Sequence, residues 1–217
     1  MQKIAMFSNV PPRRLFSMHD RESIYTIPED MRSDGLDREI LSLLGLHERV
    51  EARTPAGAPA QVLGLAVVYV PPSEDFCLLE YLAVDSAHRA RAIGGRLFAH
   101  SAEQALGDRP GAPLLVEVDA EGPADPEQEL RRRRQRFYLR HGCRRVLDCS
   151  YVLPLPGQGT PPPMDLWIYL AEPQPRLRRE TLAGWLRAIY QHVYQCSPDD
   201  PRIAEMLQPV PDPVRLE

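Results

Sequence analysis

Short apolar runs and runs with helical spacing alternate along the chain, a pattern that predicts an α/β fold of the α+β type. The run 61–70 is apolar almost throughout, so we expect a strand that is buried on both faces. Proline, glycine and polar residues bound the other predicted strands. These strands lie at residues 23–27, 49–53, 76–84, 114–118, 145–153 and 165–170.

Four segments repeat apolar residues every three or four positions, which is typical of amphipathic helices. They are predicted at 33–45, from the residue after His88 to about 106, at 126–141 and at 182–193. In the third helix the apolar side is expected to be Leu130, Phe137 and Tyr138, and Gly142 is expected to end it. The proline-containing tail from Ser197 is predicted to be mostly extended.

Together these elements predict one mixed, mostly antiparallel central sheet with helices on both faces and an added C-terminal helix. A chain of 217 residues can bury one sizeable core. We therefore expect one domain at residues 1–170, with its core motifs at 60–153. Residues 171–217 are predicted to form a helical extension and a proline-rich tail that pack on the same domain.

Charge and composition narrow the classes of partner. The net charge of −4 gives no overall attraction to phosphate backbones, so nucleic acid is not expected as a partner. The four cysteines show no zinc-ligand spacing, so no structural metal is implied. No apolar run is long enough to cross a bilayer, and we expect a cytoplasmic protein with reduced thiols and no membrane partner.

The segment 82–97 has the features of an anion site. A predicted strand ends at Val84, a short polar loop follows, and a helix opens among arginines and glycines. A helix start offers unpaired N–H groups and the positive end of the dipole, and glycines let a phosphate come close. The segment lacks a P-loop lysine and the glycine spacing of a dinucleotide fingerprint. The predicted binding residues are Leu82, Ala83, Val84, Arg89, Ala90, Arg91, Ala92, Ile93, Gly94, Gly95 and Arg96.

Two motifs in this order resemble those of GNAT-superfamily acetyltransferases. Arg89, Ala92 and Gly94 take the arginine and the two small-residue positions of the family's Arg/Gln-x-x-Gly-x-Gly/Ala pyrophosphate motif. Ala92 stands where the family usually has glycine, so its methyl group either crowds the pyrophosphate or is tolerated if the backbone stays helical. Downstream, residues 136–143 resemble the family's Phe-Tyr-x-x-x-Gly-Phe helix end, with Cys143 in place of the phenylalanine. The resemblance covers about residues 60–153.

The resemblance implies a GNAT-like fold and an enzyme that transfers an acetyl group from acetyl-CoA, by direct attack of a primary amine on the thioester. The acceptor is a small molecule, a peptide or a protein. The resemblance also implies that Tyr138 protonates the departing thiolate, although Tyr138 as a core residue is the alternative. A backbone N–H of the 82–84 strand is expected to contact the oxyanion.

Three carboxylates are candidates for the acceptor side of the reaction. Glu80, on the strand that feeds the cofactor loop, is the candidate general base, with a purely structural carboxylate as the alternative. Glu117 and Asp119 share one face of the next strand because side chains alternate along a strand. They either form an acidic pocket for a cationic acceptor or are solvated charges at the strand end.

Other functions remain open at this point. A non-catalytic acyl-CoA sensor or interaction module would bind CoA without depending on Tyr138. A nucleic-acid binder that uses the arginines at 131–134 would show steeply salt-dependent affinity, but with acidic neighbours this run is expected to be a solvated face. The C-terminal helix either completes the acceptor pocket or pairs subunits in a homodimer.

Overall fold

The computed structural model of the chain describes residues 23–26, 64–71, 73–84, 89, 91–107, 109, 111–121, 128–154, 163–171 and 176–217. The helix predicted at 33–45 and the strand predicted at 49–53 lie outside these residues. The chain divides into two compact units. The first comprises Met1–Val70 and Leu79–Gly107, and the second comprises Pro71–Leu78 and Asp108–Glu217. The prediction of one domain with a C-terminal extension stays a prediction.

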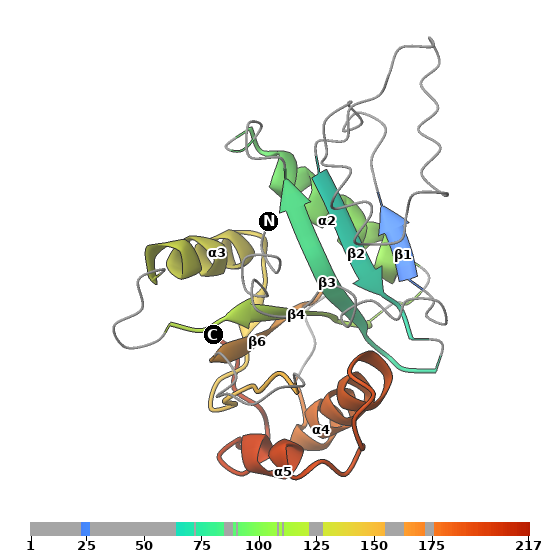
Figure 1. The fold of residues 1–217 in the computed structure, drawn as a ribbon, viewed down its shortest axis with the longest axis vertical. Coiled ribbons are helices and arrows are strands. Elements are labelled where there is room, and N and C mark those ends of the chain that lie inside the picture. Colours follow the sequence, from blue (N-terminus) through green and yellow to red (C-terminus); the bar gives the residue numbers. More distant parts are fainter. Residues whose placement is uncertain are drawn as a thin grey trace. The chain divides into compact units, whose positions relative to one another are not determined.

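Three strands and one helix form the described part of the first unit (Figure 1). Strand β1 (Ser23–Thr26) pairs antiparallel with β2 (Gly64–Tyr69), and β3 (Cys77–Val84) is the next strand in the order, entering this unit at Leu79. Helix α2 (Ile93–Leu106) packs against β2 and β1. These bounds confirm the strands predicted at 23–27, 61–70 and 76–84.

Strand β2 is buried on both faces, as its apolar sequence predicts. The neighbouring residues Val68 and Tyr69 point to opposite faces of the strand, and both are buried. Helix α2 covers these strands with a face that includes Ile93 and Leu97. The helix begins at Ile93, four residues after the predicted start, because Ala92 has a left-handed backbone that an α-helix does not accept.

The described part of the second unit contains three further strands and two groups of helices. Strand β4 (Leu114–Asp119) pairs antiparallel with β6 (Met164–Tyr169), which pairs antiparallel with β5 (Arg144–Arg145). All six residues of β4 are buried, and α3 (Gln128–Arg140) packs against this strand. Near the C-terminus lie α4 (Arg179–Ala188), the π-helix η5 (Ile189–Val193) and α5 (Pro201–Leu207), and α4 packs on α5 (Figure 1).

The predicted α/β fold, with a mixed, mostly antiparallel sheet flanked by helices, is confirmed, and the three pairings given above are antiparallel. The strands predicted at 114–118 and 165–170 and the helix predicted at 182–193 are confirmed, the helix as α4 and η5 together. Gly142, with a φ of 83°, follows α3 as predicted. Among the helices that the structure describes, none has the length and apolar character needed to span a membrane.

The long strand predicted at 145–153 is wrong. Strand β5 has only two residues, after which Val146 and Tyr151 make isolated bridges to Leu216 and Met164. Asp148 breaks the extended run because its φ is 60°, and its carboxylate accepts a 2.6 Å bond from the Arg215 guanidinium. The C-terminal residues therefore take part in the sheet edge.

The extended tail predicted from Ser197 is also wrong, because α5 lies within it. Asp200 caps this helix by accepting a bond from the Arg202 N–H at 3.1 Å, and Pro201 occupies the first helical position. Proline is well suited to that position, since a first-turn N–H has no partner within the helix.

The buried side of α3 differs from the predicted one. Leu130 is 40% exposed and Phe137 is half-buried, whereas Arg134 and Tyr138 are buried. Arg134 and Tyr138 lie four residues apart and therefore share one face of the helix. An arginine occupies the core side because β4 supplies a carboxylate for it there.

Candidate functional site

The predicted anion loop of the first unit joins the end of β3 to the start of α2. The Nε of Arg89 donates to the carbonyl of Val84 at 3.4 Å, so this arginine folds back over the strand end. Arg89, Arg91 and Arg96 are all exposed, and Gly94 and Gly95 are half-buried in the first turn of the helix. Ala90, predicted to belong to the loop, lies outside the described residues.

Ala92 is the residue at which α2 begins. Its φ of 60° and ψ of 6° are left-handed, and its carbonyl accepts a 3.2 Å bond from the N–H of Arg96. The expectation of a helical backbone at Ala92 is therefore wrong. Among the residues that the structure describes, no side chain caps the helix start, and the first turn contains no acidic residue. The start of α2 thus keeps the positive character that favours an anion.

Glu80 and the predicted oxyanion segment lie on β3. Leu82 and Ala83 are 6% and 7% exposed, and Glu80 and Val84 are half-buried. Glu80, Leu82 and Val84 alternate with their neighbours and so share one face of the strand. The structure thus places Glu80 on the same strand as the predicted oxyanion segment, and its role as a base stays a prediction.

Tyr138 is buried near the end of α3 in the second unit. It is 4% exposed, its ring meets that of Phe137 edge-on at 5.2 Å, and its carbonyl accepts the N–H of Cys143 at 3.0 Å. Burial is the main cause that raises the pKa of Tyr138 above its ordinary range, and Arg134 opposes this rise. The hydroxyl therefore keeps its proton at neutral pH, as a proton donor must, although the same burial fits a core residue.

Asp119 makes a buried ion-pair cluster with α3. Its side chain is 1% exposed, and its two oxygens meet the guanidinium groups of Arg134 and, at 3.3 Å, Arg131. Gln135 also donates to the Asp119 carbonyl at 3.0 Å. The expectation of a solvated face at 131–134 is wrong for Arg134, which is 7% exposed, and the solvated alternative for Asp119 is wrong as well.

Glu117 lies two residues before Asp119 on β4, on the same face of the strand, and has different hydrogen-bond partners. It is 5% exposed, which also contradicts a solvated strand-end charge. The hydroxyl of Tyr151 donates to Glu117 Oε1 at 2.5 Å, and the hydroxyl of Tyr194 lies 2.8 Å from Oε1 and 2.9 Å from Oε2. Sequence reasoning missed both tyrosines. Tyr194 directly follows the apolar stripe of the C-terminal helix, but no spacing links it to β4.

Metal-ligating side chains do not gather in the part of the chain that the structure describes. Within those residues, no group of three or more histidine, cysteine, aspartate or glutamate side chains is placed to hold an ion. The functional groups found in this part of the chain are instead arginines at a helix start, buried carboxylates and tyrosine hydroxyls.

Two CTP synthases share short stretches of sequence similarity with this chain. No family model matches the chain. The CTP synthase of Caulobacter sp. (strain K31) is 43% identical over 47 residues, which is 22% of this chain and 8% of that protein. The CTP synthase of Natronomonas pharaonis is 44% identical over 48 residues, 22% of this chain and 9% of that protein. The chain therefore spans less than a tenth of the length of these relatives.

Several solved structures are similar to this chain. A Bacteroides thetaiotaomicron protein described as a GNAT-family acetyltransferase has a TM-score of 0.49 at 21% identity, covering 73% of this chain and 82% of its own. An IAA acetyltransferase from Bacillus cereus has a TM-score of 0.39 at 16% identity, with 69% and 99% covered. Arabidopsis thaliana NAA60 in complex with acetyl-CoA has a TM-score of 0.38 at 18% identity, with 54% and 70% covered. At these values the similarities assign neither activity nor substrate to this chain.

Proposed function

We propose that this chain is an N-acetyltransferase of the GNAT type that moves an acetyl group from acetyl-CoA to a primary amine. The observation that carries the proposal is the start of α2. Residues that match the family's pyrophosphate motif lie there, at a helix start whose described surroundings provide no side-chain cap and whose first turn contains no acidic residue. The exposed Arg89, Arg91 and Arg96 add positive charge to the same segment.

The donor is bound through its phosphates. A pyrophosphate would accept bonds from the first N–H groups of α2, because these groups have no carbonyl partner within the helix. Gly94 and Gly95 carry no side chain in that turn, which leaves room for the close approach of a phosphate. The arginines would add charge-assisted hydrogen bonds.

The transfer itself needs three groups. A backbone N–H of the Leu82, Ala83 and Val84 segment stabilises the oxyanion that forms when the amine attacks the thioester. Tyr138 gives its proton to the departing thiolate, which its protonated state at neutral pH supports. Glu80 is the candidate base for the acceptor amine, on the grounds of its position on β3.

The acceptor is proposed to be a small molecule or a peptide with a primary amine, in a cytoplasmic setting. Glu117 keeps its place in the proposed acceptor pocket. The charge of Asp119 is already balanced by Arg131 and Arg134, which makes it less suited to hold a cation. That the C-terminal helices complete this pocket and that they form a homodimer contact are two separate proposals.

Calorimetric titration with acetyl-CoA tests the donor site. Wild-type protein should bind acetyl-CoA with micromolar affinity, and Gly94→Glu should abolish binding, because it places a carboxylate in the proposed phosphate site. Gly184→Glu is the matched control, since a Cβ atom at Gly184 on α4 would meet nothing within 4 Å. If the wild type does not bind acetyl-CoA, the proposed acetyltransferase function is rejected.

Turnover separates the enzyme from its alternative, an acyl-CoA sensor or interaction module. The burial of Tyr138 is compatible with that alternative, because a core tyrosine needs no chemistry. Tyr138→Phe should keep acetyl-CoA binding and lower acetyl transfer by about 10²-fold or more if Tyr138 is the general acid. Binding without transfer, in wild type and variant alike, would identify the non-catalytic module.

A further inference from the structure

The carboxylate of Glu117 is buried and receives hydrogen bonds from two tyrosine hydroxyls, and so far it has only a place in the proposed acceptor pocket. We propose that Glu117, acting through the hydroxyl of Tyr194, is the base that takes the proton of the acceptor amine. This inference rests on the proposed acetyl transfer. It assigns the role of general base to Glu117, whereas Glu80 is a candidate for that role only because of its position on β3.

The hydrogen bonds to Glu117 fit an ionised carboxylate. An ionised carboxylate only accepts hydrogen bonds, and a tyrosine hydroxyl is able to donate. Two such hydroxyls, from Tyr151 and Tyr194, lie within 2.9 Å of the Glu117 oxygens. A carboxylate that is 5% exposed and receives two hydroxyl bonds is held in one orientation.

The two tyrosines differ in their access to a substrate. Tyr151 is 2% exposed, and burial together with the nearby Glu117 raises its pKa well above the ordinary value. Tyr151 is therefore a fixed donor that orients the carboxylate. Tyr194 is half-buried, so part of this residue is open to solvent, and its hydroxyl lies against the Glu117 carboxylate. Tyr194 is the member of the pair that suits a proton relay.

A π-turn sets the position of Tyr194. The N–H of Tyr194 donates to the carbonyl of Ile189, five residues earlier, at 3.2 Å. A π-turn inserts one residue relative to an α-helix and so changes which side chain faces the sheet at the helix end. Such turns are rare and often occur at functional sites, which supports a role for the side chain that follows.

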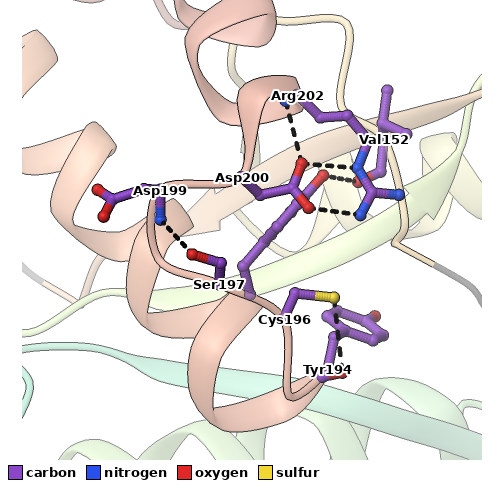
Figure 2. Close-up of polar contacts among 8 residues, drawn as sticks. Val152, Tyr194, Cys196, Ser197, Asp199, Asp200 and Arg202 are labelled. Atoms are coloured by element: carbon purple, nitrogen blue, oxygen red, sulfur yellow. Dashed lines mark hydrogen bonds and ion pairs between the residues drawn. The ribbon is translucent and has the colours of Figure 1, made fainter.

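The chain on both sides of Tyr194 is firmly anchored. Figure 2 shows the turn after η5, where the Cys196 thiol contacts the Tyr194 carbonyl and Asp200 binds Arg202. The Tyr190 hydroxyl, one turn before Tyr194, donates to the Val152 carbonyl at 2.6 Å. These contacts fix the backbone that carries Tyr194, so its hydroxyl is pre-positioned against Glu117.

The proposed step balances in protons and electrons. The acceptor ammonium passes one proton to the Tyr194 oxygen while the Tyr194 hydroxyl proton moves to Glu117, which later releases a proton to solvent. The neutral nitrogen then forms its bond to the thioester carbon, and the carbon–sulfur bond breaks with its electrons on sulfur. The second nitrogen proton replaces the one that Tyr138 gives to the thiolate. The products are one amide, one thiol and one released proton.

Two probe amines distinguish a base from a structural carboxylate. An alkylamine such as n-butylamine resembles the lysine side chain, whose pKa is about 10.4, so it is protonated at neutral pH and needs a base. Hydroxylamine is already neutral there and needs none before attack. Acetyl transfer to each probe at pH 7 is measured by release of the CoA thiol, for wild type and for Glu117→Gln, Tyr194→Phe and Glu80→Gln.

We expect Glu117→Gln and Tyr194→Phe to lower kcat/KM for n-butylamine by about 10²-fold or more and to leave hydroxylamine nearly unchanged. Tyr169→Phe, which removes a hydroxyl elsewhere in the same unit, is the control and should affect neither probe. Glutamine keeps the shape of Glu117 and an oxygen for both tyrosines, so the variant should fold, and circular dichroism checks this.

Three results would overturn the inference. An equal loss of kcat/KM with both probes in Glu117→Gln would mean that Glu117 has a structural role. A loss confined to n-butylamine and seen only in Glu80→Gln would identify Glu80 as the base. A wild type that binds acetyl-CoA but transfers to neither probe would reject this base while the donor site stands. Failure to bind acetyl-CoA would instead reject the proposed function itself, and the calorimetric titration detects that separately.

Discussion

Ala92 adopts a backbone conformation that alanine rarely takes. Its φ of 60° brings Cβ close to the following carbonyl, at a cost of about 1–2 kcal/mol that glycine does not incur. Glycine also loses more entropy on folding, which offsets part of this gain. We expect Ala92→Gly to raise the free energy of unfolding by about 1 kcal/mol, measured by urea denaturation.

The control for this substitution is an alanine in the same helix with an ordinary backbone. Ala102 is buried in the interior of α2, so Ala102→Gly should lower the free energy of unfolding by about 1 kcal/mol or more. Opposite signs for the two variants would establish that the conformation of Ala92, and not helix propensity, decides the effect. A loss of stability in Ala92→Gly would mean that its left-handed backbone carries no cost.

At the scale of elements, the cluster of Asp119 with Arg134 joins α3 to β4. Fully breaking a buried ion pair typically costs about 3–5 kcal/mol, and removing Arg134 leaves the buried Asp119 paired with Arg131, so the loss should approach this range without exceeding it. We expect a loss of this size for Arg134→Met in thermal or urea unfolding. Arg132→Met is the matched control, because Arg132 pairs with Glu121 in solvent and such pairs contribute about 0–1 kcal/mol. Equal losses in the two variants would contradict a special role of the buried pair.

The cap of α5 should give stability a dependence on acid pH. Hydrogen bonds from Arg202 lower the pKa of the Asp200 carboxyl below its ordinary value of 3.8. The ionised cap therefore stabilises the fold above pH 3.8, and this contribution is lost as the pH falls through the lower folded pKa. Asp200→Ala should cost about 1 kcal/mol at pH 7 and progressively less in acid. Asp199→Ala, at the exposed neighbouring residue, should leave the free energy of unfolding unchanged both at pH 7 and in acid.

Sequence reasoning succeeded where one short segment determines its own structure. The apolar run of β2 and the stop at Gly142 are local signals, and both are confirmed. It failed where a distant residue decides. The buried side of α3 depends on Asp119, which lies on β4. The spacing of apolar residues within α3 therefore gives no sign of it. In α5 the signals were local, an Asp200 cap and a proline at the first position, but the many prolines of the tail favoured an extended prediction.

At the scale of the whole molecule, the candidate site shows the same limit. The loop of Arg89 and Gly94 and the position of Tyr138 follow from motifs, because each motif is contiguous in sequence. The hydroxyl of Tyr194 reaches Glu117 across 77 positions of sequence, and only the fold brings the two together. Contacts of this separation need the tertiary structure, so a single sequence predicts residue types at a site better than it predicts their partners.

Donor binding should stabilise the folded chain as a whole. A ligand that binds only the folded state adds about 2.7 kcal/mol at one hundred times its Kd, so saturating acetyl-CoA should raise the unfolding temperature. The Gly94→Glu variant should show no such rise, and Gly184→Glu should behave as wild type. Hydrogen exchange should also slow at residues 93–95, where the N–H groups of the first turn of α2 would acquire phosphate partners. Tyr138→Phe should retain this protection while losing turnover, because the proposed role of its hydroxyl begins only when the thiolate departs.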